Sequence, residues 1–366
     1  MLEDIVKSAM NSPRQSVHDS ADEEIKISVI GVGGGGNNTI NRLRRLGVKG
    51  AQLIAMNADR QHLSMIDEGI TKMLIGKSVT RGLGCGGFPE VGAKCAEVDR
   101  KQIEELVGGS HLVFICAGMG GGTGTGAAPV VAEVARAQGA IVIAMVTYPF
   151  ALERARTVKA EEGIARLREI ADSTIILDNN RLVQLVPNLP MNQAFLVADE
   201  ILAKAIDGLV FTITQPSLVN IDFADVKAIM SQGDVGMIAV GSGKGTNKVE
   251  EAVNGVRTNR LLDVDFTGAK GALIHIAGGH DLTLGDAIHA GERITEEMDA
   301  HASVKWGARL VPDYDGKLEI TAIVTGVNSP QIAGKTHTMT SSHGMGGRHG
   351  GKAAASEEFG GIEVIG

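Results

Sequence analysis

The sequence predicts an α/β fold: a doubly wound, mainly parallel sheet, joined by a long central helix to a smaller α+β domain and followed by a disordered tail. Three observations predict it. In the N-terminal half, apolar runs of strand length alternate with segments of helical spacing, which is the pattern of parallel sheets. Two of these runs lead directly into glycine-rich stretches. After residue 235 the pattern changes to that of a small sheet with two helices.

The bulk composition is typical of a globular protein. The 366 residues allow about two domains with tails, and 43% of them are hydrophobic. The net charge of −8, without a long basic patch, argues against nucleic acid as a partner. Cys85, Cys95 and Cys116 form no C-x-x-C pair, so we expect reduced thiols and a cytoplasmic location. No stretch approaches the ~18 apolar residues of a membrane span, so we expect no direct membrane insertion.

The first domain is expected at residues 25–190, after a polar and acidic arm at residues 1–24. Its strands are short apolar runs bounded by Gly, Asn or Asp, and its helices carry apolar residues three or four positions apart. The expected strands are residues 25–30, 51–56, 112–117, 140–147 and 174–177, and the expected helices are residues 39–46 and 127–137. This alternation predicts the mainly parallel sheet.

A long helix is expected at residues 191–213, where apolar residues recur at three- and four-residue spacing. At ~1.5 Å per residue it would span roughly 30 Å, so we interpret it as a strut between two domains. The second domain, residues 214–327, contains a short helix at 226–230. Its expected strands are residues 236–241, 271–277, 303–310 and 318–324, and its other expected helices are residues 248–256 and 286–298. Residues 328–366 are rich in Gly, Ser, His and Thr and predict a disordered tail.

The strongest functional signal is the stretch HLVFICAGMGGGTGTG at residues 111–126. A buried strand, a loop almost without side chains and a helix follow one another there. This order brings bare backbone N–H groups and the positive end of a helix dipole to one place, which suits a phosphate. Thr123 and Thr125 can add hydroxyl donors. A merely flexible loop is the disfavoured alternative, because this loop is held between a strand and a helix.

An earlier glycine cluster allows a different ligand class. Gly31, Gly33 and Gly36 satisfy the dinucleotide pattern G-x-G-x-x-G, and Asp59 stands about where a ribose-binding carboxylate would be. A Rossmann-type NAD(P)-dependent oxidoreductase is therefore an alternative. It is weakened by a third glycine cluster at residues 81–87, because a dinucleotide needs one cradle, whereas here several loops converge.

Two carboxylates and an amide crowd the segment 217–226, which contains Asn220, Asp222 and Asp225. From the pattern alone, the favoured interpretation is that Asp222 caps the following helix and Asp225 is its first-turn acid. The tail ends in an apolar cluster from Phe359 to Ile365, which is either a docking peptide or a weakly sticky terminus. No histidine of the second domain has metal-ligand spacing, and no independent metal site is predicted.

Two widely separated motifs resemble those of the FtsZ family, the tubulin-superfamily GTPases of prokaryotic cell division. GGGTGTG at 120–126 resembles the superfamily's phosphate loop. Asn220-x-Asp222-x-x-Asp225 resembles the family's loop that reaches into the nucleotide of the next subunit. The resemblance covers about residues 25–327, and the terminal peptide differs from the common bacterial docking motif, which favours a divergent, archaeal-type lineage.

The resemblance implies that the first domain binds GTP or GDP, with Mg²⁺ at the phosphates. The residues implied to contact the nucleotide occupy the places of the family's motifs: Gly34, Gly35, Gly36, Asn37, Asn38, Gly121, Gly122, Thr123, Gly124 and Thr125 at the phosphates, Gly84 near the γ-phosphate, Glu153 and Arg156 at the ribose, and Asn179 and Asp199 at the guanine. One departure is the sequence Glu153-Arg-Ala-Arg156, one residue shorter than the family's and without its glycine, which leaves open whether Arg154 or Arg156 stands at the ribose.

The resemblance also implies a mechanism. A subunit would hold GTP but lack the acid that orients the attacking water, and Asp222 and Asp225 of a neighbour, helped by Asn220, would complete the site. Such head-to-tail contacts give homopolymeric filaments, expected in the cytoplasm at the mid-cell division site. The tail would bind a membrane-anchoring division protein. A non-hydrolysing, nucleotide-bound scaffold stays an alternative, in which the two aspartates only cap a helix.

Overall fold

The computed structural model describes residues 25–185, 187–214, 222–230, 236–258 and 266–327. The expected N-terminal arm, the segment 217–221 with Asn220, and the tail with its apolar end lie outside these residues. None of the described helices combines the length and the apolar character that crossing a membrane requires.

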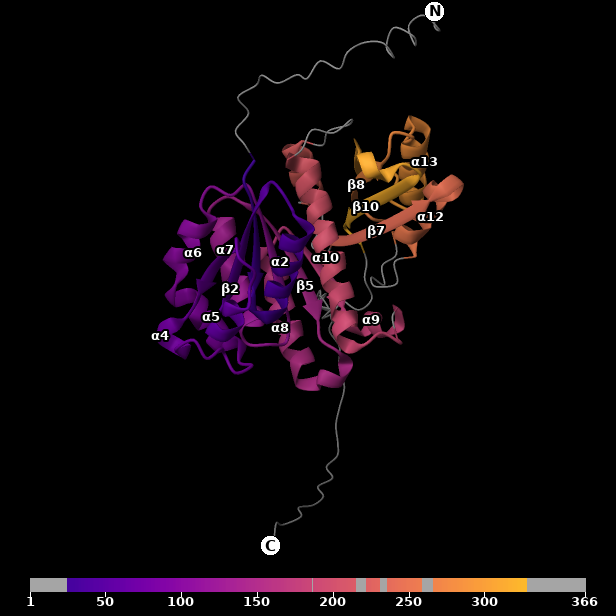
Figure 1. Cartoon of the computed structure of the whole chain (residues 1–366). Helices are drawn as coiled ribbons and strands as arrows, with labels where there is room; N and C mark the ends of the chain where they lie inside the picture. Colours follow the sequence, from indigo (N-terminus) through magenta and orange to yellow (C-terminus); the bar gives the residue numbers. More distant parts are fainter. Residues whose placement is uncertain (1–24, 186, 215–221, 231–235, 259–265, 328–366) are drawn as a thin grey trace, which may run out of the picture. The chain divides into compact units, whose positions relative to one another are not determined.

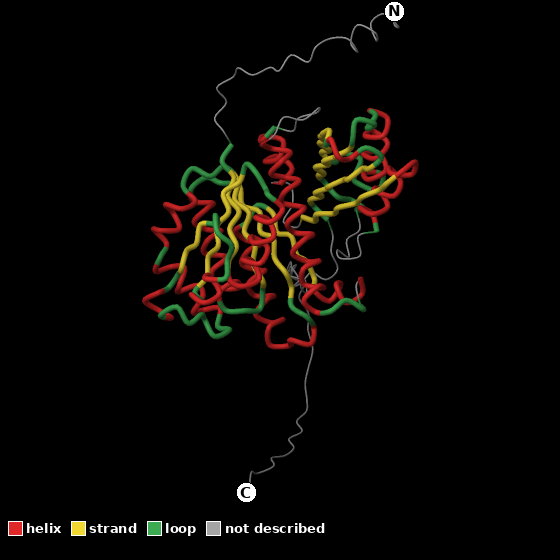
Figure 2. Tube along the Cα trace, viewed as in Figure 1, coloured by secondary structure: helices red, strands yellow, loops and turns green. Residues whose placement is uncertain are grey.

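The first sheet has six parallel strands in the order β3-β2-β1-β4-β5-β6. Strands are drawn in yellow in Figure 2. The strands are β1 (Ile27–Val32), β2 (Ala51–Asn57), β3 (Thr71–Leu74), β4 (Leu112–Gly118), β5 (Ile141–Tyr148) and β6 (Ser173–Asp178). The chain order reverses between β1 and β4, which pair directly, so the loops after these two strands start from adjacent carboxyl ends. The predicted doubly wound, mainly parallel sheet is confirmed.

Helices cover both faces of this sheet (Figure 1). They are α2 (Gly33–Leu46), α3 (Arg60–Ser64), α4 (Lys77–Thr80), α5 (Pro89–Val98), α6 (Arg100–Val107), α7 (Thr123–Ala137), α8 (Arg154–Ile170) and α9 (Asn179–Leu185), with a 3₁₀ turn η1 (Ala151–Glu153). The α5, α6, α7 and α8 helices share one apolar cluster with the sheet. The elements β3, α3 to α6, α8 and α9 are not among those expected from the sequence.

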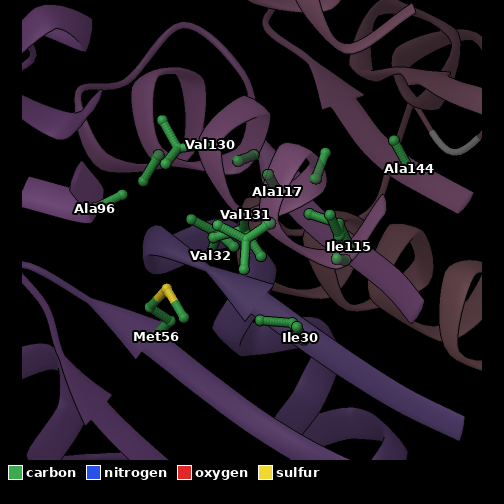
Figure 3. Close-up of a cluster of buried hydrophobic side chains, with 14 of the residues drawn as sticks. Ile30, Val32, Met56, Ala96, Ile115, Ala117, Val130, Val131 and Ala144 are labelled. Atoms are coloured by element: carbon green, nitrogen blue, oxygen red, sulfur yellow. The ribbon is translucent and has the colours of Figure 1, made fainter. Parts of the chain in front are cut away.

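Aliphatic side chains fill the space between the sheet and the helices of this cluster (Figure 3). Ile30 and Val32 of β1, Ile115 of β4 and Val131 of α7 are all 0% exposed. Parallel strands that are covered on both faces are apolar at successive positions instead of alternating with polar ones. This double burial explains the short continuous apolar runs in the sequence.

The α2 and α7 helices begin several residues earlier than expected, at Gly33 and Thr123. Glycines that were expected in loops therefore form the first helical turns. Close packing accounts for this: a Cβ at Gly36 would lie 1.9 Å from the carbonyl oxygen of Cys116 in β4. Only glycine allows the start of α2 to approach the neighbouring strand so closely.

The second sheet is smaller and mixed, with the order β7-β10-β8-β9. This part of the chain comprises α11 (Phe223–Met230), β7 (Gly236–Lys244), η2 (Gly245–Asn247), α12 (Lys248–Arg257), β8 (Gly271–Gly278), α13 (Leu284–Thr295), β9 (Ser303–Leu310), η3 (Pro312–Tyr314) and β10 (Lys317–Thr325). The β10 strand is antiparallel to β7 and β8, and β9 is parallel to β8. The predicted long helix is α10 (Met191–Thr214), which packs against α2 and contacts β7 and β8. The predicted α+β layer and central helix are confirmed.

Candidate functional site

A cavity of about 760 Å³ opens at the carboxyl ends of the parallel strands. This volume is within the ~300–1,000 Å³ typical of small-molecule sites. Most of the nucleotide-binding residues expected from the sequence line it, namely Gly34, Gly35, Asn38, Gly84, Gly121, Gly122, Thr123, Gly124, Glu153, Arg156, Asn179 and Asp199. The cavity lies where ligands of open parallel sheets bind, at the point where the strand order reverses.

The starts of α2 and α7 meet at this cavity. A Cβ at Gly33 would lie 2.9 Å from the backbone nitrogen of Gly124, and one at Gly35 would lie 3.1 Å from the Cα of Gly118. The first N–H groups of a helix have no intrahelical partner and carry partial positive charge. Two such helix starts, facing one cavity with almost no side chains between them, form a site suited to an anion such as a phosphate.

Gly36, Asn37 and Thr125 lie behind the cavity wall and are not part of its lining. Thr125 Oγ1 accepts a 2.8 Å hydrogen bond from the backbone N–H of Gly120, whose φ is +92°. Thr125 therefore fixes the turn before α7. The Asn37 side chain is 0% exposed, and neither its Nδ2 nor its Oδ1 has a hydrogen-bond partner among the described residues. A bound polar group or a water would satisfy this amide.

The third glycine loop, residues 82–87, borders the cavity beside α7. The backbone N–H of Gly84 donates a 3.1 Å hydrogen bond to the carbonyl of Ala58 after β2. Thr123 Oγ1 donates to Cys85 Sγ at 3.3 Å. The loop is thus tied both to β2 and to α7, so three glycine-rich segments converge on one cavity, as the sequence predicted.

Asp59 also lines the cavity, but its carboxylate is already engaged. Asp59 Oδ1 accepts hydrogen bonds of 2.8 Å from the backbone N–H of Gln61 and 3.1 Å from that of His62. It therefore caps α3. This capping gives a structural reason for an acid directly after β2, and it weakens the dinucleotide interpretation.

Residues of α9 and α10 also line the cavity. Burial raises the pKa of the Asp199 carboxyl to about 6, although Thr39 Oγ1 donates a 3.2 Å hydrogen bond to its Oδ1. Phe195 precedes Asp199 by one helical turn and lines the same cavity, with its ring 5.8 Å from that of Phe150. Phe195 was not among the site residues expected from the sequence. The available signal was an aromatic residue four positions before an acid, hence on one face of a helix.

Glu153 and Arg156 border the cavity and form an ion pair. Arg156 also packs against the glycine-rich turn, because a Cβ at Gly120 would lie 2.7 Å from the backbone carbonyl oxygen of Arg156. Arg154 is not part of the cavity lining. Of the two candidate arginines, Arg156 is therefore the one placed to reach a ligand.

Asp222 and Asp225 do not line the cavity of their own chain. Asp222 Oδ1 accepts a 2.6 Å hydrogen bond from the backbone N–H of Asp225, which is a helix-capping contact for α11. Asp225 Oδ1 lies 2.8 Å from Nζ of Lys305 in β9. Within the described ranges, no group of three or more His, Cys, Asp or Glu side chains is arranged to hold a metal ion.

The fold and the cavity define a class: an α/β protein whose glycine-rich helix starts form an anion site at the switch point of a parallel sheet, followed by a mixed α+β domain. Residues 26–187 match the model of the Tubulin/FtsZ family, GTPase domain, and residues 234–328 match the FtsZ family, C-terminal domain. The chain belongs to the FtsZ family of cell-division proteins.

Relatives and solved structures agree with this assignment. The chain is 58% identical over 315 residues to cell division protein FtsZ 2 of Methanocaldococcus jannaschii, covering 85% of this chain and 83% of the relative. It is 52% identical over 341 residues to FtsZ 2 of Haloferax volcanii, covering 91% and 85%. An empty FtsZ dimer from M. jannaschii superposes with a TM-score of 0.78 at 40% identity, covering 88% and 91%. The family supports a GTP-binding, cytoskeletal role in cell division, and the comparisons give the oxidoreductase alternative no support.

Proposed function

We propose that this protein binds GTP in the cavity and hydrolyses it when subunits stack head to tail. One observation carries the proposal: every acidic side chain that lines the cavity already has a partner in its own chain. Asp59 caps α3, Glu153 pairs with Arg156, and Asp199 accepts a hydrogen bond from Thr39 of α2. No carboxylate among the described lining residues is therefore free to orient a water at the phosphates, and the missing acid has to come from elsewhere.

The second subunit supplies the missing acids, Asp222 and Asp225, with Asn220 helping to position them. The side chain of Asp225 is 29% exposed and Asp222 is exposed, so a neighbouring molecule can reach both. Leu83 and Leu152, which line the cavity, are 84% and 90% exposed, and a second copy covering the cavity would bury them. A contact between different faces of two copies does not close on itself, and it therefore gives filaments.

The parts of the nucleotide are assigned along the cavity. The triphosphate lies at the starts of α2 and α7, next to the loop of residues 82–87, and the ribose lies near Glu153 and Arg156. Asn179 and Asp199 recognise the guanine, because an ionised carboxylate accepts hydrogen bonds from the guanine N1–H and amino group. Mg²⁺ would accompany the phosphates, whose oxygens suit its preference for oxygen ligands. Bound there, it would supply charge neutralisation for phosphoryl transfer.

In the cell, these filaments assemble in the cytoplasm at the mid-cell division site. Residues from Phe359 to Ile365, which lie outside the described part of the chain, dock to a membrane-anchoring division protein. The apolar composition of this short segment at the end of a polar tail supports this assignment.

Light scattering after GTP addition, with GDP as the control and phosphate release read in the same tube, tests the proposal. Scattering should rise with GTP only, and turnover per subunit should increase steeply with protein concentration because the site is completed by a neighbour. A turnover independent of concentration refutes the proposal. If Asp222→Ala assembles and hydrolyses GTP like the parent, Asp222 has no part in hydrolysis and only caps α11.

A further inference from the structure

A cation stands directly beside the proposed activating acids. Lys305 belongs to β9, the edge strand of the second sheet, and its Nζ lies 2.8 Å from Oδ1 of Asp225 on α11. The hydrogen bond to Asp225, together with the charges of Asp225 and Asp222, raises the pKa of Lys305. Lys305 therefore interacts electrostatically with both aspartates.

Stability does not account for this ion pair. The side chain of Lys305 is 43% exposed and that of Asp225 is 29% exposed. Ion pairs in such exposed positions contribute little to folding, because water screens the attraction and two long side chains must be ordered. The pair does, however, restrict the rotamer of Asp225, while the backbone N–H of Asp225 fixes Asp222. Both carboxylates are therefore held before any partner arrives.

Charge gives the lysine a second effect. A loop with two carboxylates that approaches a triphosphate is repelled, since like charges disfavour close approach. A lysine beside Asp225 offsets part of this repulsion. It also keeps the carboxylate in the fixed geometry that orientation of a water requires, and positioning errors of ~1 Å are costly for such reactions.

We infer that Lys305 is a positioning residue for hydrolysis in trans: it holds Asp225 and offsets the charge of the acidic loop as that loop reaches the nucleotide of the next subunit. This inference rests on the proposed function. Lys305 touches neither the nucleotide nor the water; it acts through Asp225.

The first experiment compares Lys305→Gln and Lys305→Arg with a matched control, Lys317→Gln, which removes an exposed lysine of β10 in the same sheet. Phosphate release is measured per assembled subunit, and assembly is measured separately with a non-hydrolysable GTP analogue. Lys305→Gln should lower turnover per assembled subunit by about ten- to a hundredfold, Lys305→Arg should restore much of it, and Lys317→Gln should match the parent. Equal turnover for all variants overturns the inference.

A mixing experiment separates a positioning role from a general structural one. One partner carries Asp222→Ala and Asp225→Ala but keeps its cavity, and the other carries Asp199→Ala but keeps its acidic loop. Hydrolysis then occurs only where the intact loop meets the intact cavity. Lys305→Gln should abolish most of this activity when it is placed in the loop donor and change little in the cavity donor.

Equal loss in both positions, or loss in neither, overturns the inference. Failure of the parent protein to couple hydrolysis to assembly instead overturns the proposed function, so the two failures are distinguishable. Thermal unfolding of Lys305→Gln, expected within a few degrees of the parent because the ion pair is exposed, confirms that the variant is folded.

Discussion

Asp199 is a cavity carboxylate whose ionised form is made costly by burial. Its pKa is raised from 3.8 to about 6, so the folded state binds the proton more tightly than the unfolded state does. Stability must therefore fall as pH rises through this interval, and the cost is fully present above about pH 6. A carboxylate retained at such a cost is consistent with a functional demand for its charge.

Asp199→Asn should therefore stabilise the nucleotide-free protein at neutral pH. The shift of roughly two pKa units corresponds to at most about 3 kcal/mol, because each unit is worth ~1.4 kcal/mol. Thermal unfolding measured across pH should show the variant above the parent at about pH 7, with the difference vanishing near pH 4. A difference that does not vary with pH would contradict the burial of this charge.

The same substitution should change the choice of base. A carboxylate accepts from the N1–H and amino group of guanine, whereas an amide can donate to the 2-oxygen of xanthine. Asp199→Asn should lose about 10- to 100-fold in affinity for GTP and gain affinity for xanthosine triphosphate, since an unpaired polar group in a site is costly. Titration with fluorescent nucleotides measures both; unchanged GTP affinity would remove Asp199 from the base site.

At the scale of the elements, glycines decide how close α7 comes to its neighbours. A Cβ at Gly126 would lie 1.8 Å from the carbonyl oxygen of Pro89, the first residue of α5. Gly126→Ala should force the two helices apart and cost about 1–3 kcal/mol of unfolding free energy. It should also weaken nucleotide binding, because the start of α7 moves with the helix.

Gly291→Ala is the matched control, since a Cβ at this position of α13 meets no atom within 4 Å. It should stabilise the protein by about 0.5–1 kcal/mol, as alanine favours helices over glycine. Denaturant unfolding measures both variants. If Gly126→Ala proves as stable as Gly291→Ala, the close contact between α5 and α7 is not real.

These glycines also explain which elements the sequence could predict. Strands such as residues 112–117 depend on local apolar runs, and their prediction is confirmed by β4. The early start of α2 depends instead on the close contact between Gly36 and Cys116 of β4. These residues are far apart in the sequence, so the spacing of apolar residues along the chain does not indicate the contact. The β3 strand, with only four residues and two exposed positions, has too weak a local pattern.

The site shows the same division between local and distant information. The glycine-rich motifs are local in sequence, so a site suited to phosphate could be predicted at them, although the first residues of α2 and α7 could not. Asp59 was assigned to a possible ribose, but its role depends on where α3 begins. Phe195 lines the cavity because of where α10 lies, and Arg156 lines it in place of Arg154 because of where α8 begins. The pattern of a single sequence does not specify how helices pack around a cavity.

At the scale of the whole molecule, Asp222 and Asp225 are not part of the cavity lining within one chain. Leu83 and Leu152, in contrast, stand exposed at the cavity. A head-to-tail stack resolves both features at once, because a second copy would cover the leucines and deliver the carboxylates. The exposed leucines therefore test the assembly independently of the acids.

Leu83→Ser combined with Leu152→Ser should raise the critical concentration for GTP-dependent assembly by roughly tenfold or more. Burying one large aliphatic side chain is worth about 1.5–3 kcal/mol, and ~1.4 kcal/mol is tenfold in an equilibrium constant. Leu284→Ser is the control, because Leu284 is also exposed, at 66%, but lies at the start of α13 and not at the cavity. Sedimentation of polymer over a concentration series measures the effect. If the double variant assembles at the concentration of the control, the second copy does not cover the cavity, and the trans supply of Asp222 and Asp225 loses its geometric basis.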